Sequence, residues 1–104
     1  MNDRILSLLG LCRRAGKLSL GNDAVLASVR DGAARLVLCT ADISENTYKK
    51  IAYAAGDSSV PCLTLNRTKD SLGNAIGKYC AVVSVNDAGF AKTLAGYIQT
   101  ESEE

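Results

Sequence analysis

The residues of this chain that could do chemistry gather in one stretch, where three cations precede the expected start of a helix. Arg13, Arg14 and Lys17 lead into the motif Gly21-Asn22-Asp23. Exposed amide N–H groups at a helix start attract anions, neighbouring cations strengthen that attraction, and a glycine lets another backbone approach. The stretch is therefore a candidate for holding a phosphate backbone. An ordinary capped helix beside a solvated charge cluster explains the same residues equally well.

Enzymatic catalysis has little support in the sequence. The chain has no His, so the commonest general base is missing. Asp42 and Cys39 lie near the end of an expected strand, where α/β folds place catalytic groups, but capping explains Asp42 and no cation adjoins Cys39 to activate its thiol. Segment 73–78 resembles a nucleotide-binding loop, yet its glycines are one residue too close and Tyr79 follows in place of Ser or Thr. We expect a protein that is not an enzyme.

The four cysteines are interpreted as small core residues of a reducing compartment. They form no Cys-x-x-Cys pair, and without His they match neither a zinc site nor a thioredoxin-type motif. Each lies in an apolar segment, as buried free thiols do. These residues are Cys12, Cys39, Cys62 and Cys80. We expect neither a metal nor another cofactor.

Length, composition and charge predict one folded domain with a mild preference for anionic partners. The 104 residues, 47% hydrophobic, suffice to close a core without metal or disulfide. The net charge is +1, and leaving out the three glutamates of the last four residues raises it to +4 for residues 1–100. We expect the domain to cover residues 1–100 and an acidic tail to cover residues 101–104.

No targeting or membrane segment is apparent. The apolar run after Arg4 is short, and two arginines interrupt it, so it does not match a secretory signal. No stretch approaches the length of a membrane span. We expect a soluble, cytoplasmic protein.

Hydrophobic spacing and capping residues predict five helices that alternate with four strands. The expected strands cover residues 17–20, 36–39, 62–65 and 81–85. The fourth expected helix covers residues 69–76, and the other four follow Asn2 or Asp3, Asn22 or Asp23, Ser44 or Asp42, and Asn86 or Asp87. The third helix is expected to bury Tyr48, Ile51, Ala52 and Ala55. The continuous apolar run at 36–39 is typical of a strand covered on both faces. Such alternation favours a three-layer α/β/α sandwich with a small central sheet of about four strands.

Five short motifs occur in the order and spacing of a known family. They are Gly21-Asn22-Asp23, the segment 32–38, Ala41-Asp42, Val60-Pro61 and the segment 72–77. With them the chain resembles, over nearly the whole domain, the ribosomal L7Ae/L30e family of kink-turn RNA-binding proteins. The segments 44–50 and 87–91 are most similar to the small bacterial branch of that family, the YlxQ-like proteins.

The resemblance implies an α/β/α sandwich that binds structured RNA without catalysis. The RNA would be ribosomal RNA, in the ribosome, or another RNA with a kink-turn-like internal loop, and neither DNA nor a membrane is an expected partner. The start of the second helix would enter the internal loop, and the loop before the last strand would support a flipped-out nucleotide. Irregular RNA loops expose base edges that a regular helix hides. The implied RNA-binding residues are Gly21, Asn22, Asp23, Arg13, Arg14, Lys17, Arg35, Lys78 and Tyr79.

The second helix departs from the pattern of the strong kink-turn binders, which carry Asn-Glu and then a Lys one turn later. In one register Asp23, Ala24 and Ala27 take these three positions, and in the other Asn22, Asp23 and Leu26 do. Both registers lack the cation, a contact typically worth about 1–3 kcal/mol. The alternative function is therefore a protein-interaction module on the same fold, with lost or weak kink-turn binding.

Overall fold

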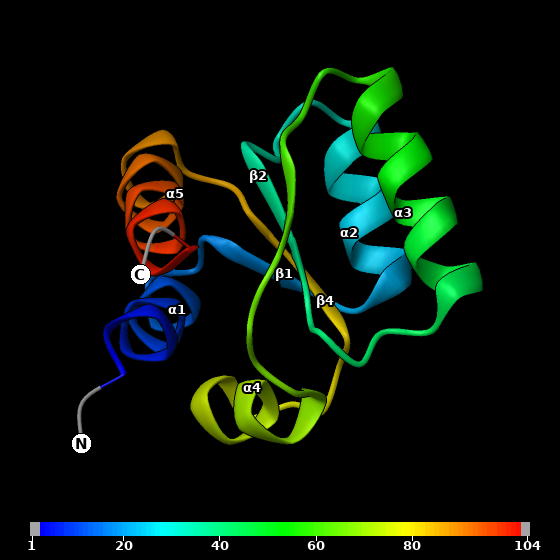
Figure 1. The fold of residues 1–104 in the computed structure, drawn as a ribbon. Coiled ribbons are helices and arrows are strands. Elements are labelled where there is room, and N and C mark those ends of the chain that lie inside the picture. Colours follow the sequence, from blue (N-terminus) through cyan, green and yellow to red (C-terminus); the bar gives the residue numbers. More distant parts are fainter. Residues whose placement is uncertain (1–2, 103–104) are drawn as a thin grey trace.

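The computed structural model describes residues 3–102, in which a four-stranded sheet lies between two layers of helices (Figure 1). In chain order the elements are α1 (Arg4–Arg14), β1 (Leu18–Leu20), α2 (Asn22–Arg30), β2 (Leu36–Cys39), α3 (Glu45–Asp57), β3 (Cys62–Thr64), α4 (Lys69–Ile76), β4 (Val82–Val85) and α5 (Ala88–Ser102). The predicted alternation of five helices and four strands and the predicted α/β/α sandwich are confirmed.

The sheet is mixed, with the strand order β1-β4-β2-β3. The pairs β1–β4 and β4–β2 are antiparallel, with Leu18 opposite Val85 and Leu36 opposite the same residue. The pair β2–β3 is parallel, with Leu38 opposite Leu63. The two central strands, β4 and β2, consist of buried residues throughout, which agrees with their apolar sequences.

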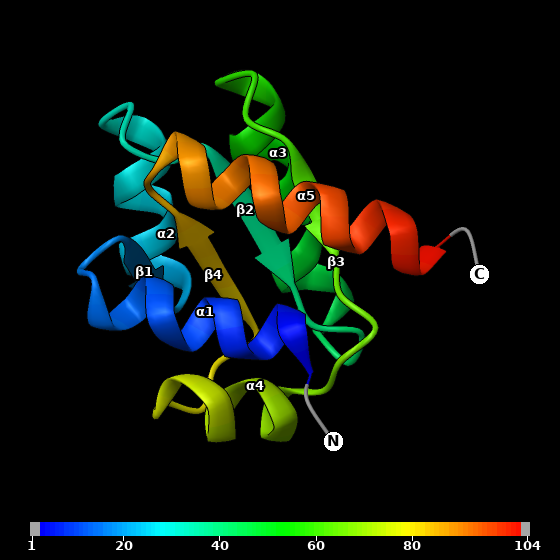
Figure 2. The same ribbon diagram turned by 90° about the vertical axis from the view of Figure 1, so that its left-hand side faces the viewer.

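Each face of the sheet carries its own hydrophobic core. Helices α1 and α5 cover one face, with α4 packed against α1 at the lower end, and α2 and α3 cover the other (Figures 1 and 2). Alternate residues of β2 belong to the two cores, because successive side chains of a strand point to opposite faces. Leu36 and Leu38 face the α1–α5 side, whereas Val37 and Cys39 face the α2–α3 side.

The structure decides which of the alternative residues caps each helix. Asp3 caps α1, since its carboxylate accepts a hydrogen bond from the Leu6 amide, and Ser44 caps α3 in the same way through Thr47. At the start of α5, Asp87 accepts from the Phe90 amide at 2.9 Å. Asn2, the other candidate for α1, lies outside the described residues.

Three sequence-based expectations about the elements are wrong. Neither Asn22 nor Asp23 caps α2, because Gly21 is the capping residue and Asn22 is already helical. Asp42 does not cap α3, because its carboxylate accepts instead from the backbone N–H of Lys69, 3.0 Å away. Tyr48 is 38% exposed, because the first turn of α3 lies at the margin of the core and the buried stripe begins with Ile51.

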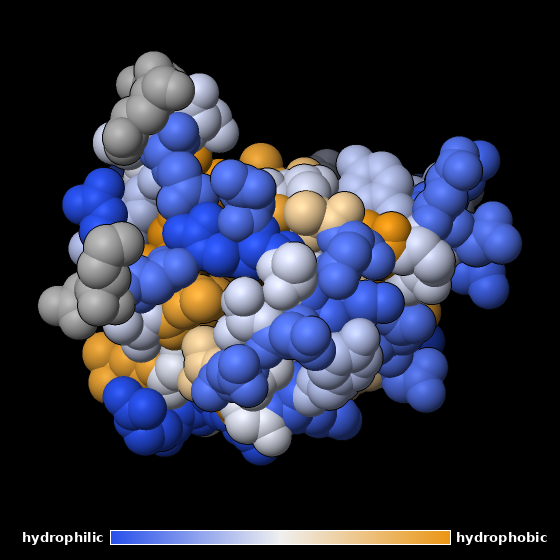
Figure 3. Space-filling model, turned by 60° about the horizontal axis from the view of Figure 1, so that its bottom comes forward, coloured by the Kyte–Doolittle hydropathy of each residue, from blue (hydrophilic) through white to orange (hydrophobic). Residues whose placement is uncertain are grey.

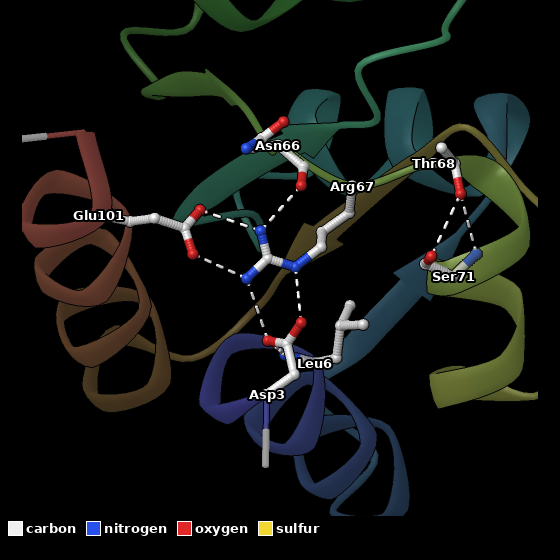
Figure 4. Close-up of polar contacts among 7 residues, drawn as sticks. All are labelled: Asp3, Leu6, Asn66, Arg67, Thr68, Ser71 and Glu101. Atoms are coloured by element: carbon white, nitrogen blue, oxygen red, sulfur yellow. Dashed lines mark hydrogen bonds and ion pairs between the residues drawn. The ribbon is translucent and has the colours of Figure 1, made fainter. Parts of the chain in front are cut away.

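Arg67 ties the first helix to the last (Figure 4). Its guanidinium donates to both carboxylate oxygens of Asp3 at 2.6 and 3.1 Å and to both of Glu101 at 2.9 and 2.7 Å. These hydrogen bonds lower the pKa of both carboxyls and raise the pKa of Arg67. Glu101, expected in a tail, thus belongs to the last turn of α5, while Glu103 and Glu104 lie outside the described residues.

Candidate nucleic-acid interface

At the start of α2, the first amide groups have no partner among residues 3–102. Gly21 has φ +89°, a left-handed conformation that favours glycine, and its N–H donates to the Val82 carbonyl at 3.0 Å. No side chain caps the helix, and the next three residues, Asn22 to Ala24, are exposed. The orphan N–H groups of this first turn carry partial positive charge. They are therefore open to a ligand.

Three helix starts meet at one groove. It has a volume of about 280 Å³ and lies at the lower end of Figure 1, where α2, α3 and α4 begin. The groove is lined by Gly21, Asn22, Ile43, Ser44, Thr47, Lys69, Cys80 and Ala81. The positive ends of three helix dipoles thus act on the same space, and the cationic residue Lys69 lines it. This is an arrangement that attracts anions.

The loop between α4 and β4 presents an exposed aromatic ring beside this groove. Tyr79 is 64% exposed, and the Lys69 Nζ lies 5.9 Å from the centre of its ring. A Cβ at Gly73 would lie 3.2 Å from the Tyr79 Cα, so the missing side chain lets the loop pack closely against α4. An exposed ring next to a cation can stack on an unpaired base. Lys78, also exposed, precedes it in the same loop.

Arg13 lies at the edge of this region, whereas Arg14 does not. The Arg13 guanidinium donates to the Ile76 carbonyl at the end of α4, immediately before the loop of Lys78 and Tyr79. Arg14 lines a different, shallow hollow between α1 and α4, together with Ser7 and Ala75. The two neighbouring arginines therefore point to different places.

Lys17 and Arg35 lie at the opposite end of the sheet. The Lys17 carbonyl accepts from the Asn86 amide, and the Arg35 amide donates to the Val85 carbonyl, whereas Gly21 contacts Val82 at the other end of β4. The expectation that Lys17 lies close to the Gly21 helix start is thus wrong. The reason is that β1 runs across the molecule between Lys17 and Gly21, and an extended strand covers about 3.3 Å per residue.

Three further residues line the groove, although the sequence did not predict them as binding residues: Lys69, Ser44 and Thr47. Ser44 and Lys69 carried only the ordinary signals of a helix start, and 47 residues separate Lys69 from Asn22 in the sequence. Only the packing of α4 beside the starts of α2 and α3 brings them together. Figure 3 looks onto the end of the molecule that α4 covers, and hydrophilic residues occupy most of this face.

The buried thiols do not have the properties of nucleophiles. A hydrogen bond with Cys62 and burial together raise the pKa of Cys39 well above its usual range, and burial raises the pKa of Cys12 to about 11. Burial also raises the pKa of Cys80, although it lines the groove. A thiol that stays protonated at neutral pH is a poor nucleophile.

Within residues 3–102 there is no group of three or more His, Cys, Asp or Glu side chains placed to hold a metal ion. In the same part of the chain, no helix combines the length and the apolar composition needed to cross a membrane.

Comparison with known proteins identifies the family. The family model described as the ribosomal protein L7Ae/L30e/S12e/Gadd45 family matches residues 3–95. The chain belongs to this family. It is 42% identical over 88 residues to the RNA-binding protein YlxQ of Bacillus subtilis, an alignment that covers 84% of this chain and 87% of the relative. It is 37% identical over 96 residues to the RNA-binding protein YlxQ of Enterococcus faecium, covering 92% of each chain.

A solved structure of the same architecture comes from Bacillus halodurans and is described as a protein of unknown function. Its TM-score is 0.87 at 36% identity, and the match covers 94% of this chain and 99% of the other. The two structures therefore share their fold over 94% of this chain.

Proposed function

We propose that this protein binds structured RNA without catalysis, and that the RNA occupies the groove where α2, α3 and α4 begin. The observation that carries the proposal is the uncapped, exposed start of α2 in one groove with Lys69 and beside the Tyr79 ring. The names of the YlxQ relatives support it. We infer that the RNA is a kink-turn-like internal loop, in ribosomal RNA or in another structured RNA.

Each group at the groove suits a different part of such a loop. The free amides of α2 and the Lys69 ammonium bind phosphate oxygens, since both donate and carry positive charge. The Asp23 carboxylate repels phosphates but accepts hydrogen bonds from base amino groups, so we assign it, with the Asn22 amide, to base edges. Tyr79 stacks on an unpaired base. Arg13 and Lys78 contact phosphates at the margin.

The missing cation of α2 has a substitute in this arrangement. Ala24 and Ala27 leave the helix without the expected positive side chain, while Lys69, the first residue of α4, lines the groove. We therefore expect measurable binding in spite of the departure. Binding that depends on Lys69 would separate this function from the alternative, a protein-interaction module that does not recognise RNA.

The test is a titration of the protein with a kink-turn RNA and with an unkinked duplex of the same length. We expect tighter binding to the kinked RNA and an affinity that falls as salt rises. Lys69→Gln should weaken binding about tenfold and reduce the salt slope by about one, as loss of one phosphate contact does. Lys92→Gln, which removes an exposed cation of α5, is the matched control and should bind like the unaltered protein. Equal binding to both RNAs would contradict the proposal.

A further inference from the structure

A second groove lies at the far end of the sheet, between the ends of α2 and α3 and the start of β2. Its volume is about 480 Å³. Arg30 and Arg35 line it from two different elements, and Ser58 and Ser59 line it from the turn after α3. Among the described residues, no carboxylate lines it: Asp31 and Asp57 lie at the same helix ends but are not part of its wall.

Neither arginine has a role in holding the described fold together. Within residues 3–102, Arg30 and Arg35 form no ion pair and no side-chain hydrogen bond, and both are exposed. Arg67 shows the contrast, because its guanidinium is tied to two carboxylates. The negative end of the α2 dipole accounts for Arg30 in the last turn of that helix, but Arg35 lies outside any helix. The α2 dipole thus explains Arg30, whereas Arg35 has no structural explanation.

The two guanidinium groups of this groove suit a phosphate group, and they must outweigh the partial negative charge of the C-terminal ends of α2 and α3. Guanidinium groups present planar forks of N–H donors that match phosphate oxygens, and serine hydroxyls add further donors. We propose that this second groove binds backbone phosphates of the RNA stem next to the loop held at the start of α2. The inference rests on the proposed function, because it assigns the groove to the same RNA.

The length of α2 fits one RNA that contacts both grooves. The eight steps from Asn22 to Arg30 correspond to about 12 Å along the helix axis. A nucleic-acid strand covers that length in about four nucleotides, at about 3.4 Å each. Lys17 lies at the same end of the sheet as Arg35, although it does not line the groove, and adds a third exposed cation. An RNA stem that runs from the first groove along α2 would therefore reach the positively charged side chains of Arg30, Arg35 and Lys17.

The test compares two RNAs that share one kink-turn loop and differ in one stem. The short RNA ends directly beside the loop, and the long RNA continues for one further helical turn. The double variant Arg30→Gln, Arg35→Gln should bind the short RNA like the unaltered protein and the long RNA about tenfold more weakly. Its slope of log affinity against log salt on the long RNA should be smaller by about 1.4–1.8.

The matched control is the double variant Lys50→Gln, Lys92→Gln, which removes the same charge from exposed positions of α3 and α5. Equal affinity and equal salt slope of the two double variants on the long RNA would overturn the inference. A response of the Ser58 and Ser59 amide resonances to millimolar inorganic phosphate but not to the long RNA would also overturn it, since the groove would then serve a free phosphate ligand.

Failure of the proposed function gives a different result. In that case the unaltered protein would not prefer the kinked loop to a duplex, and Asn22→Ala would leave the affinity for the short RNA unchanged. If the second groove alone is misassigned, Asn22→Ala weakens the binding of both RNAs, and the arginine double variant weakens the binding of neither.

Discussion

At the scale of single residues, Gly21 decides the geometry of the candidate interface. Its positive φ turns the chain directly from β1 into α2, and no capping side chain follows, so the amides of the first turn stay open. A capping Asn or Asp in its place would occupy one of these amides itself. The glycine therefore serves both the turn and the exposure of the binding groups.

We predict that Gly21→Ala lowers the free energy of unfolding by about 1 kcal/mol, because an alanine is strained at positive φ. Gly96→Ala is the control. That glycine lies inside α5, where a Cβ meets nothing within 4 Å, so alanine should stabilise the protein by about 0.5–1 kcal/mol. Chemical denaturation measures both changes. Equal effects of the two substitutions would contradict the assignment of Gly21 to a left-handed turn.

The exposed rings of Tyr79 and Tyr53 offer a second comparison at this scale. Tyr79 is 64% exposed beside the groove, and Tyr53 is 78% exposed on α3, where it does not line the groove. We predict that Tyr79→Ala weakens RNA binding by about 1–3 kcal/mol, the usual contribution of one stacked base, and that Tyr53→Ala leaves binding unchanged. Fluorescence anisotropy with a kink-turn RNA distinguishes the two. Similar losses of RNA affinity in both variants would contradict a contact between Tyr79 and the RNA.

At the scale of elements, the assembly of the site depends on how helices are tied to one another. Three helix starts form the groove, and none of them is complete as a binding surface alone. Arg13 links α1 to the end of α4, and Arg67 links the start of α1 to the last turn of α5. The Arg13 contact, together with the Lys69 amide that donates to Asp42, holds the two ends of α4 against neighbouring segments.

The Arg67 cluster makes stability depend on pH in a defined direction. The hydrogen bonds from Arg67 lower the pKa of Asp3 below its ordinary 3.8 and that of Glu101 below its ordinary 4.5. A carboxyl with a lowered folded-state pKa stabilises the fold above its unfolded value, and this stabilisation is lost as the pH falls through the folded value. We predict a stability loss that begins as the pH drops below 4.5.

Arg67→Met should remove part of that pH dependence. At neutral pH we expect a destabilisation of about 1 kcal/mol, since the partner carboxylates are one third exposed and solvent screens the pairs. Thermal unfolding of both proteins between pH 3 and pH 7 is the measurement. If the unfolding temperature of both proteins changed with pH in the same way, Arg67 would not be the cause of the pH dependence.

At the scale of the whole molecule, the two candidate RNA-binding grooves lie at opposite ends of a rigid sheet. The central strands β2 and β4 are buried on both faces and join the two cores. Both grooves lie at the ends of the layers, where helices begin or finish. A sheet of this kind holds the two ends at a constant separation, which a folded RNA can match.

This arrangement predicts an order of hydrogen exchange. The amides of Val37 and Leu38 in β2 and of Val83 and Ser84 in β4 should exchange most slowly, through global unfolding, because these residues are fully buried. The exposed amides of Lys78 and Tyr79 should exchange fastest. Native-state exchange followed by NMR measures both. Faster exchange in β2 than in α1 would contradict a sheet that forms the stable centre.

The sequence by itself determined the elements and their class. Hydrophobic spacing located nine elements, and the apolar run at Leu36–Cys39 predicted a strand covered on both sides, because local patterns encode which face is buried. The ordered motifs from Gly21 to Gly77 were sufficient for the family. Local patterns failed at the start of α2, where Gly21 takes the place of the expected side-chain cap.

Only the tertiary structure decided which cations share a surface. Lys17 is four residues from Gly21 but lies at the other end of the sheet, while Lys69 is 48 residues away and lines the same groove. The extended strand β1 separates Lys17 from Gly21 by the length of the sheet, because a strand covers about 3.3 Å per residue. Helix α4 is distant in the sequence, but its first residue packs beside the starts of α2 and α3. Nearness along the chain therefore could not identify the binding surface, and the packing of α4 beside α2 and α3 was needed.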